Sequence, residues 1–247
     1  MNKKLVVLAA AASVTLALLV TRTASAEELT AFQVMDRAKA NWQGGTFHGL
    51  VTLDVTQAAQ SRSYRVEVWS QGETLGLIRF LAPAADAGSG YLMKDDELWY
   101  YTPAAGKAVS LPKMALSDSL FGSGPALEDL LHGTLSENYE ATMTRDSTDY
   151  LLTLTPKPQA PVVYGHLDVR VREDFAIVSI DYYDQRGAVL RTARFSEYLS
   201  LPGRIVATLI VVEEKNGDRS VERLEDPEFN VAIDPKVFTV ESLEAGK

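Results

Sequence analysis

Apolar residues recur at helical spacing near the start of the chain and at every second position through most of the rest. Phe32, Met35, Ala38 and Trp42 lie three or four residues apart, and Thr30 precedes them as a possible cap. This spacing predicts one helix that ends before two consecutive glycines. A stripe of this kind indicates packing against a core more often than a ligand site.

Beyond the helix, apolar and polar residues alternate along segments of three to ten residues. In the segment 47–55, for example, Val51, Leu53 and Val55 share one face while Thr52 and Asp54 share the other. Such alternation is typical of half-buried strands in an antiparallel sheet. The predicted strands are 47–55, 64–69, 74–81, 91–93, 98–101, 107–111, 139–145, 150–155, 164–172, 176–183, 189–198, 204–213 and 219–224.

One further helix is predicted at residues 126–131, between Pro125 and Gly133. Two helices are too few to cover a flat sheet of about a dozen strands, so we expect the sheet to curl on itself, with the helices lidding the opening. The fold class is therefore mainly β with few helices, in one domain. The pattern leaves open whether side chains fill the interior or an apolar ligand occupies it.

The N-terminal residues predict export. Lys3 and Lys4 precede an apolar run of 16 residues at 5–20, and Ala24-Ser25-Ala26 follows as a cleavage signal. A membrane anchor is the alternative, but a span needs about 18 or more apolar residues. We expect residues 1–26 to be a signal peptide and residues 27–247 to be a single domain in the periplasm.

Charge and cysteine content narrow the function. The formal net charge is −9, and removal of 1–26 takes away Lys3, Lys4 and Arg22, which leaves 21 basic and 33 acidic residues, or −12. This acidity argues against binding to nucleic acid or to an anionic membrane through a basic face. The absence of cysteine excludes disulfides, thiol catalysis and a lipid-modified cysteine after the signal.

No residue pattern indicates catalysis, a metal or a cofactor. His48, His132 and His166 fall in different predicted elements and lack the spacing of a helical zinc site. The acidic runs at 95–97, 213–214 and 222–226 are expected to be solvated, because neighbouring acids in turns point apart. We therefore expect a protein that is not an enzyme.

A series of short segments is distributed over most of the chain beyond the signal. They are residues 78–84, 88–92, 95–103, 120–123, 127–130, 152–157, 180–184 and 195–198. In sequence, order and spacing, these segments resemble the outer-membrane lipoprotein-sorting family, which is related to the periplasmic lipoprotein carrier LolA.

The resemblance implies a curved, incomplete antiparallel barrel with helices across its open side and a hydrophobic cavity that takes acyl chains. Better-known carriers have an arginine–proline pair, whose arginine helps to latch the lid, at the place of residues 68–72, and this chain lacks that pair. The implied cargo is therefore wider: the acyl chains of lipoproteins or of other lipids. The candidate cavity wall is Val51, Leu53, Val66, Val68, Ile78, Phe80, Leu92, Trp99 and Tyr101, with Phe32, Met35 and Leu127 on the lid side.

Two binding functions remain open from the sequence, beside a hydrolase acting on envelope substrates, which no residue pattern indicates. The first is a carrier that moves acyl chains toward the outer membrane, with an inner-membrane transporter and an outer-membrane acceptor as partners. The second is an accessory or sensor subunit of an inner-membrane lipid exporter. Both use the same pocket, so residue patterns do not separate them.

Overall fold

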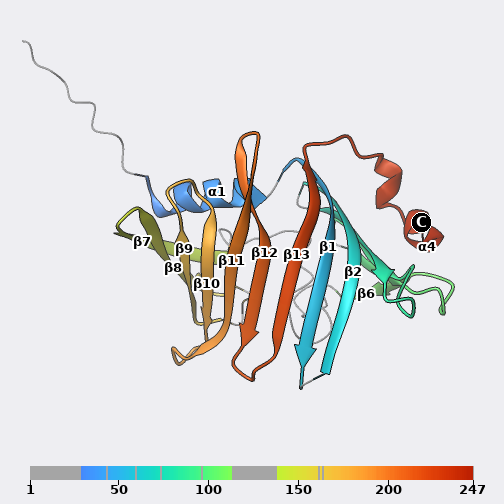
Figure 1. The fold of residues 1–247 in the computed structure, drawn as a ribbon, viewed down its shortest axis with the longest axis horizontal. Coiled ribbons are helices and arrows are strands. Elements are labelled where there is room, and N and C mark those ends of the chain that lie inside the picture. Colours follow the sequence, from blue (N-terminus) through green and yellow to red (C-terminus); the bar gives the residue numbers. More distant parts are fainter. Residues whose placement is uncertain are drawn as a thin grey trace, which may run out of the picture.

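The structure is a computed structural model that describes residues 29–42, 44–58, 60–72, 74–95, 97–112, 138–160, 162 and 164–246. All the strands within these ranges form one antiparallel sheet (Figure 1). The strands are β1 (Thr46–Gln57), β2 (Gln60–Gln71), β3 (Leu75–Ala82), β4 (Gly90–Lys94), β5 (Glu97–Tyr101), β6 (Val109–Leu111), β7 (Tyr139–Asp146), β8 (Asp149–Pro156), β9 (His166–Val171), β10 (Ile177–Tyr183), β11 (Val189–Leu201), β12 (Arg204–Glu214) and β13 (Arg219–Phe229).

The path of the chain through the sheet is simple. The strand order is β6-β5-β4-β3-β2-β1-β13-β12-β11-β10-β9-β8-β7, so the first and last strands are neighbours in the middle. From β1 the chain moves strand by strand to one edge at β6, and it resumes at the opposite edge with β7. It then returns strand by strand to β13, beside β1.

The sheet is open, because its edge strands β6 and β7 do not pair with each other. Figure 1 shows both ends of the sheet turned back behind the central strands. The prediction of a single curved antiparallel sheet in a mainly β protein is confirmed. The helix predicted at 126–131 and the signal peptide predicted at 1–26 lie outside the described residues.

Strand register assigns each alternating side chain to one of two faces, since directly opposed residues point to the same side. Val51 on β1 is opposed by Val66 on β2 and by Leu224 on β13. We call the face that carries Val51 the inner face and the opposite one the outer face. The alternation predicted for residues 47–55 and 64–69 is the alternation that the structure shows.

Helix α1 (Ala31–Trp42) packs on the inner face over the half of the sheet formed by β7–β12 (Figure 1). Its first turn is closed by a reciprocal pair of hydrogen bonds, in which Thr30 Oγ1 accepts from the Gln33 amide and Gln33 Oε1 accepts from the Thr30 amide. Val34, Met35 and Ala38 are buried against the strands. The N-terminal helix is therefore found where the apolar stripe predicts it.

The C-terminal residues cover part of the outer face. A short 3-10 helix, η3 (Pro235–Phe238), leads to α4 (Val240–Ala245), and together they pack on β3, β4 and β5. No helix is predicted here from apolar periodicity, because α4 is only six residues long. Its capping residues are the signal: Thr239 Oγ1 accepts from the Ser242 amide, and Gly246 ends the helix with φ 62°.

The predicted strands correspond to the observed ones, with differences at the ends. The largest difference is at β13, where the predicted strand 219–224 continues to Phe229. Asp226 has φ 47° within this strand, in the left-handed region, so the alternation of its side chains is interrupted there. A regular period of two does not extend across such a residue.

Candidate functional site

Apolar side chains cover the inner face over β1–β5. Val51 is opposed by Val66, which is opposed by Phe80, and Val68 is opposed by Ile78 in the next row. These side chains are buried and belong to one continuous cluster. We call it the N-terminal inner cluster; its members are Val51, Leu53, Val55, Tyr64, Val66, Val68, Ile78, Phe80, Met93 and Leu98.

A second apolar cluster lies on the same face over β7–β12, beneath α1. Leu152 on β8 is opposed by Val169 on β9, and Val169 is opposed by Ile180 on β10. We call it the C-terminal inner cluster. Its members are Val34, Met35, Ala38, Tyr139, Tyr150, Leu152, Leu154, Leu167, Val169, Val171, Ile177, Ile180, Ala193 and Val212.

Asn41 holds α1 in place over this cluster. Its Oδ1 accepts a hydrogen bond of 3.0 Å from the backbone N–H of Ile205, and its Nδ2 donates one of 3.2 Å to the carbonyl of Asp174. The side chain is buried, so both bonds are shielded from water. One amide thus joins the end of the helix to β12 and to the turn between β9 and β10.

Two buried polar side chains stand between the apolar clusters. Glu222 on β13 is opposed by Leu53 on β1 and by Ile210 on β12, and only 6% of it is exposed. Ser220, two residues earlier on the same face, is fully buried, and its Oγ has no hydrogen-bond partner among the described residues. The middle of the inner face therefore carries a carboxylate and a hydroxyl.

The expectation that the acids at 222–226 are solvated is wrong for Glu222. The residue lies within a strand, where alternation turns its side chain onto the covered face. Ser220, Glu222 and Leu224 follow the period of two that marks the inner face, which is the sequence signal for this site. Asp95, by contrast, is exposed and lies in the hairpin turn between β4 and β5, with φ 56°, as expected for a solvated acid in a turn.

The structure separates the predicted cavity residues into several places. Six lie together in the N-terminal inner cluster: Val51, Leu53, Val66, Val68, Ile78 and Phe80. Met35 lies on the same face, under α1, whereas Phe32 on that helix is 41% exposed. Leu127 lies outside the described residues.

Leu92, Trp99 and Tyr101 lie on the outer face. Leu92 is opposed by Leu77 and by Trp99, and all three belong to or pack against the cluster that Phe238 and Leu243 complete. Strands β4 and β5, which carry these three residues, have apolar side chains on both faces, so their composition does not indicate which side faces a cavity. The C-terminal helices occupy the side on which these three residues lie.

His48 forms a connected polar group on the outer face. Its Nδ1 lies 3.0 Å from Glu228 Oε2, its Nε2 lies 2.9 Å from Glu67 Oε1, and its ring stacks on Trp69 at 5.2 Å. Partial burial by itself lowers the pKa of His48, but the hydrogen bonds to Glu228 and Glu67 and their charges raise it above its usual value. The expectation that His48 is a hydrogen-bonded surface histidine fits this arrangement.

Within the described ranges, no group of three or more histidine and carboxylate side chains is arranged to hold a metal ion. None of the helices described there is long and apolar enough to cross a membrane.

An open, curled antiparallel sheet with an apolar inner face defines the LolA class of folds. A LolA superfamily protein from Nitrosomonas europaea matches with a TM-score of 0.71 and 22% identity, over 87% of this chain and 100% of its own. A putative outer membrane lipoprotein-sorting protein domain from Vibrio parahaemolyticus matches with a TM-score of 0.74 and 20% identity, over 87% and 98%. A DUF1329 family protein from Desulfovibrio piger matches with a TM-score of 0.76 and 20% identity, over 86% and 97%.

At these identities the similarity establishes the fold, and it confirms the resemblance to the lipoprotein-sorting family at that level. A family model described as an uncharacterized protein family matches residues 72–245, and the chain belongs to that family. No curated protein sequence matches the chain significantly.

Proposed function

We infer that the protein is a carrier that binds the acyl chains of lipoproteins or other lipids on its inner face. The observation that supports this function is the continuous apolar surface of the N-terminal inner cluster on an open sheet. Removal of acyl-chain surface from water contributes about 25 cal/mol per Å². An apolar face of this kind supplies that driving force without any catalytic group.

The proposed wall consists of Val51, Leu53, Val66, Val68, Ile78 and Phe80. Leu92, Trp99 and Tyr101 are left out, because they lie on the outer face, in or against the cluster that contains Phe238 and Leu243. The wall residues are buried, so an acyl chain reaches them when the protein opens over this half of the face. A carrier that opens in this way also releases its cargo.

The proposed location is the periplasm, with residues 1–26 removed on export. The experiment for this part of the proposal is N-terminal sequencing of the protein recovered from the periplasmic fraction. A mature chain that begins at Glu27 supports it. A chain that retains Met1 and remains with the membranes contradicts it.

The binding face is tested by photo-crosslinking with a tetradecanol that carries a diazirine in the middle of its chain. Adducts are mapped by mass spectrometry to single residues of β1–β5. The proposal expects adducts at inner-face positions such as Val66 and Phe80, and few at Leu92 or Trp99. Adducts confined to the outer face, or none above the level seen with unfolded protein, would falsify it.

A further inference from the structure

A buried carboxylate in the middle of an apolar surface is costly unless it forms hydrogen bonds. Glu222 is held between Leu53 and Ile210 on the neighbouring strands, so its immediate cross-strand surroundings are apolar. A carboxylate has about four lone-pair sites. It therefore has the capacity to accept hydrogen bonds from a ligand in addition to those from partners within the protein.

Ser220 gives a second and independent indication of a ligand. Its side chain lies on the same face as Glu222, between Val55 on β1 and Val212 on β12. It is fully buried, and its hydroxyl has no hydrogen-bond partner among the described residues. An unsatisfied buried hydroxyl is uncommon in folded proteins, and a bound group that supplies the missing bond explains it.

We propose that Ser220 and Glu222 bind the polar head of an acyl-chain ligand that carries a hydrogen-bond donor, either a protonated amine or a hydroxyl. The inference rests on the proposed function, since it assigns the head group of the same ligand. A ligand with a carboxylate head is disfavoured, because its negative charge faces that of Glu222. The pair thus sets which lipids the inner face accepts.

The placement of the pair also orients the ligand. Ser220 and Glu222 stand in the middle of the sheet, with the N-terminal inner cluster on one side and the C-terminal inner cluster on the other. Helix α1 packs on the C-terminal inner cluster. With the head at Glu222, the acyl chain lies over Leu53, Val66 and Phe80.

The experiment compares three ligands of equal chain length: tetradecylamine, tetradecanol and tetradecanoate. Each displaces a fluorescent pyrenyl-decanol probe, which carries no carboxylate, from the purified protein, with every ligand below its micellar concentration. The wild-type protein is expected to bind the amine and the alcohol about tenfold or more tightly than the carboxylate. The amine donates a charge-assisted hydrogen bond to the site and the alcohol a neutral one, whereas the carboxylate donates none. Equal affinities for all three ligands would overturn the inference.

Two variants locate the effect. Glu222→Gln keeps the size of the side chain and is expected to weaken amine binding about tenfold, with less than about threefold change for the alcohol. Ser220→Ala removes one oxygen from a site where alanine also fits, and it is expected to weaken binding of the alcohol and the amine about threefold or more. Thermal unfolding of each variant verifies that it is folded.

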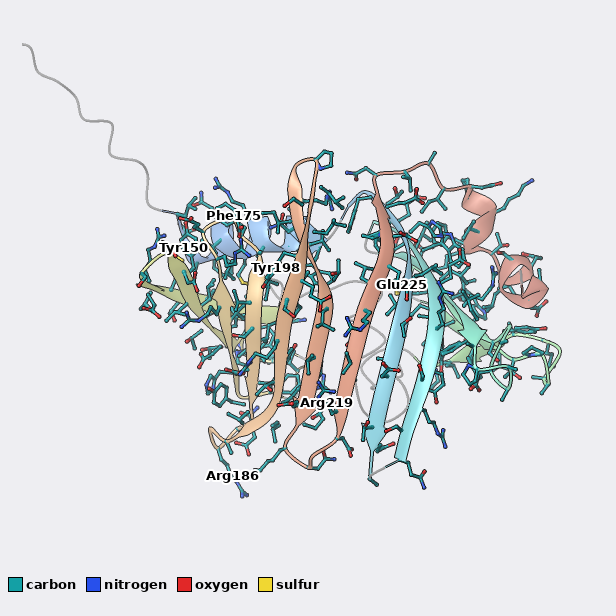
Figure 2. All side chains as sticks on the ribbon, in the orientation of Figure 1. Tyr150, Phe175, Arg186, Tyr198, Arg219 and Glu225 are labelled. Carbon is teal, nitrogen blue, oxygen red and sulfur yellow. The ribbon has the colours of Figure 1, made fainter. Side chains whose placement is uncertain are left out.

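Glu225→Gln is the matched control. Glu225, labelled in Figure 2, is on the same strand but on the outer face. Its carboxylate accepts a hydrogen bond from Thr52 and pairs with Arg65. The substitution Glu225→Gln removes the same charge as Glu222→Gln from a protein whose net charge is −9. It therefore corrects for the general attraction between the positively charged amine and an acidic protein. Equal effects of Glu222→Gln and Glu225→Gln overturn the inference and leave the proposed function intact. Failure of all three ligands to displace the probe overturns both.

Discussion

The buried side chain of Asn41 accepts a hydrogen bond from the backbone N–H of Ile205 and so ties the end of α1 to β12. The same amide donates to Asp174 in the turn before β10. Two segments more than 130 residues from Asn41 in the sequence are therefore held by one residue of the helix. This arrangement keeps α1 over the C-terminal inner cluster, and it leads to the first prediction.

Asn41→Ala is expected to lower the free energy of unfolding by about 1–3 kcal/mol, since it leaves the Ile205 N–H and the Asp174 carbonyl without their partner. Urea denaturation followed by tryptophan fluorescence measures the change. Asp36→Ala, an exposed position on the same helix, is the control and is expected to change stability by less than about 0.5 kcal/mol. Equal stability of the two variants would show that the amide does not hold the helix.

Leu77 and Ile78 provide a direct test of the two faces. They are neighbours on β3, both fully buried, with Ile78 in the N-terminal inner cluster and Leu77 in the outer-face cluster. Each replacement by alanine is expected to lower the free energy of unfolding by about 2–5 kcal/mol. Only Ile78→Ala is expected to weaken tetradecanol binding, by roughly tenfold, as about two methylene contacts are lost.

Fluorescence displacement and urea denaturation measure both properties on the same samples. Because the two substitutions remove side chains of equal size from adjacent positions, loss of stability does not by itself distinguish them. If Leu77→Ala weakens ligand binding as much as Ile78→Ala does, the inner face is not the binding face.

The carboxylates on both sides of His48 predict pH-dependent stability. A neutral imidazole has one N–H, so it satisfies only one of Glu67 and Glu228, whereas the protonated ring donates to both. The folded-state pKa is raised above 6.5, so the stabilisation is present below that value and is lost as the pH rises through the raised pKa.

His48→Gln is therefore expected to lose more stability at about pH 6 than at about pH 9, with a difference of up to about 1 kcal/mol for these partly exposed pairs. Urea denaturation at the two pH values gives this difference. His166→Gln, at a ring that stacks on Tyr183, is the control. The same loss for His48→Gln at both pH values would contradict the prediction.

Gly90 allows the C-terminal helix to approach β4. A Cβ at this position would lie 2.5 Å from the carbonyl oxygen of Ile78 and 3.0 Å from Cδ1 of Leu243. Gly90→Ala is expected to lower the free energy of unfolding by about 1–3 kcal/mol, because backbone atoms have to shift. Gly45→Ala is the control, since the nearest atom to its Cβ is 3.6 Å away. Thermal unfolding separates them; equal melting temperatures would rule out the steric role of Gly90.

The sequence by itself determined the local elements of this protein. Alternation of apolar and polar residues predicts the strands, as in 47–55 and 64–69, because a strand directs successive side chains to opposite sides. The stripe from Phe32 to Trp42 predicts α1 by the same reasoning with the period of a helix. The short α4 has no apolar repeat, and only its capping residues indicate it.

The tertiary structure decided which face each residue serves. Leu92 and Trp99 come from strands that are apolar on both sides. Only the pairing of Leu92 with Leu77 and with Trp99, and the packing of Leu243 in the same cluster, place them on the outer face. Glu222 belongs to an acidic run that is hydrophilic in sequence. Its burial follows from Leu53, which is 169 positions away in the chain, standing directly opposite it on β1. Local pattern sets the period of a strand, whereas strand pairing sets the environment of each side chain.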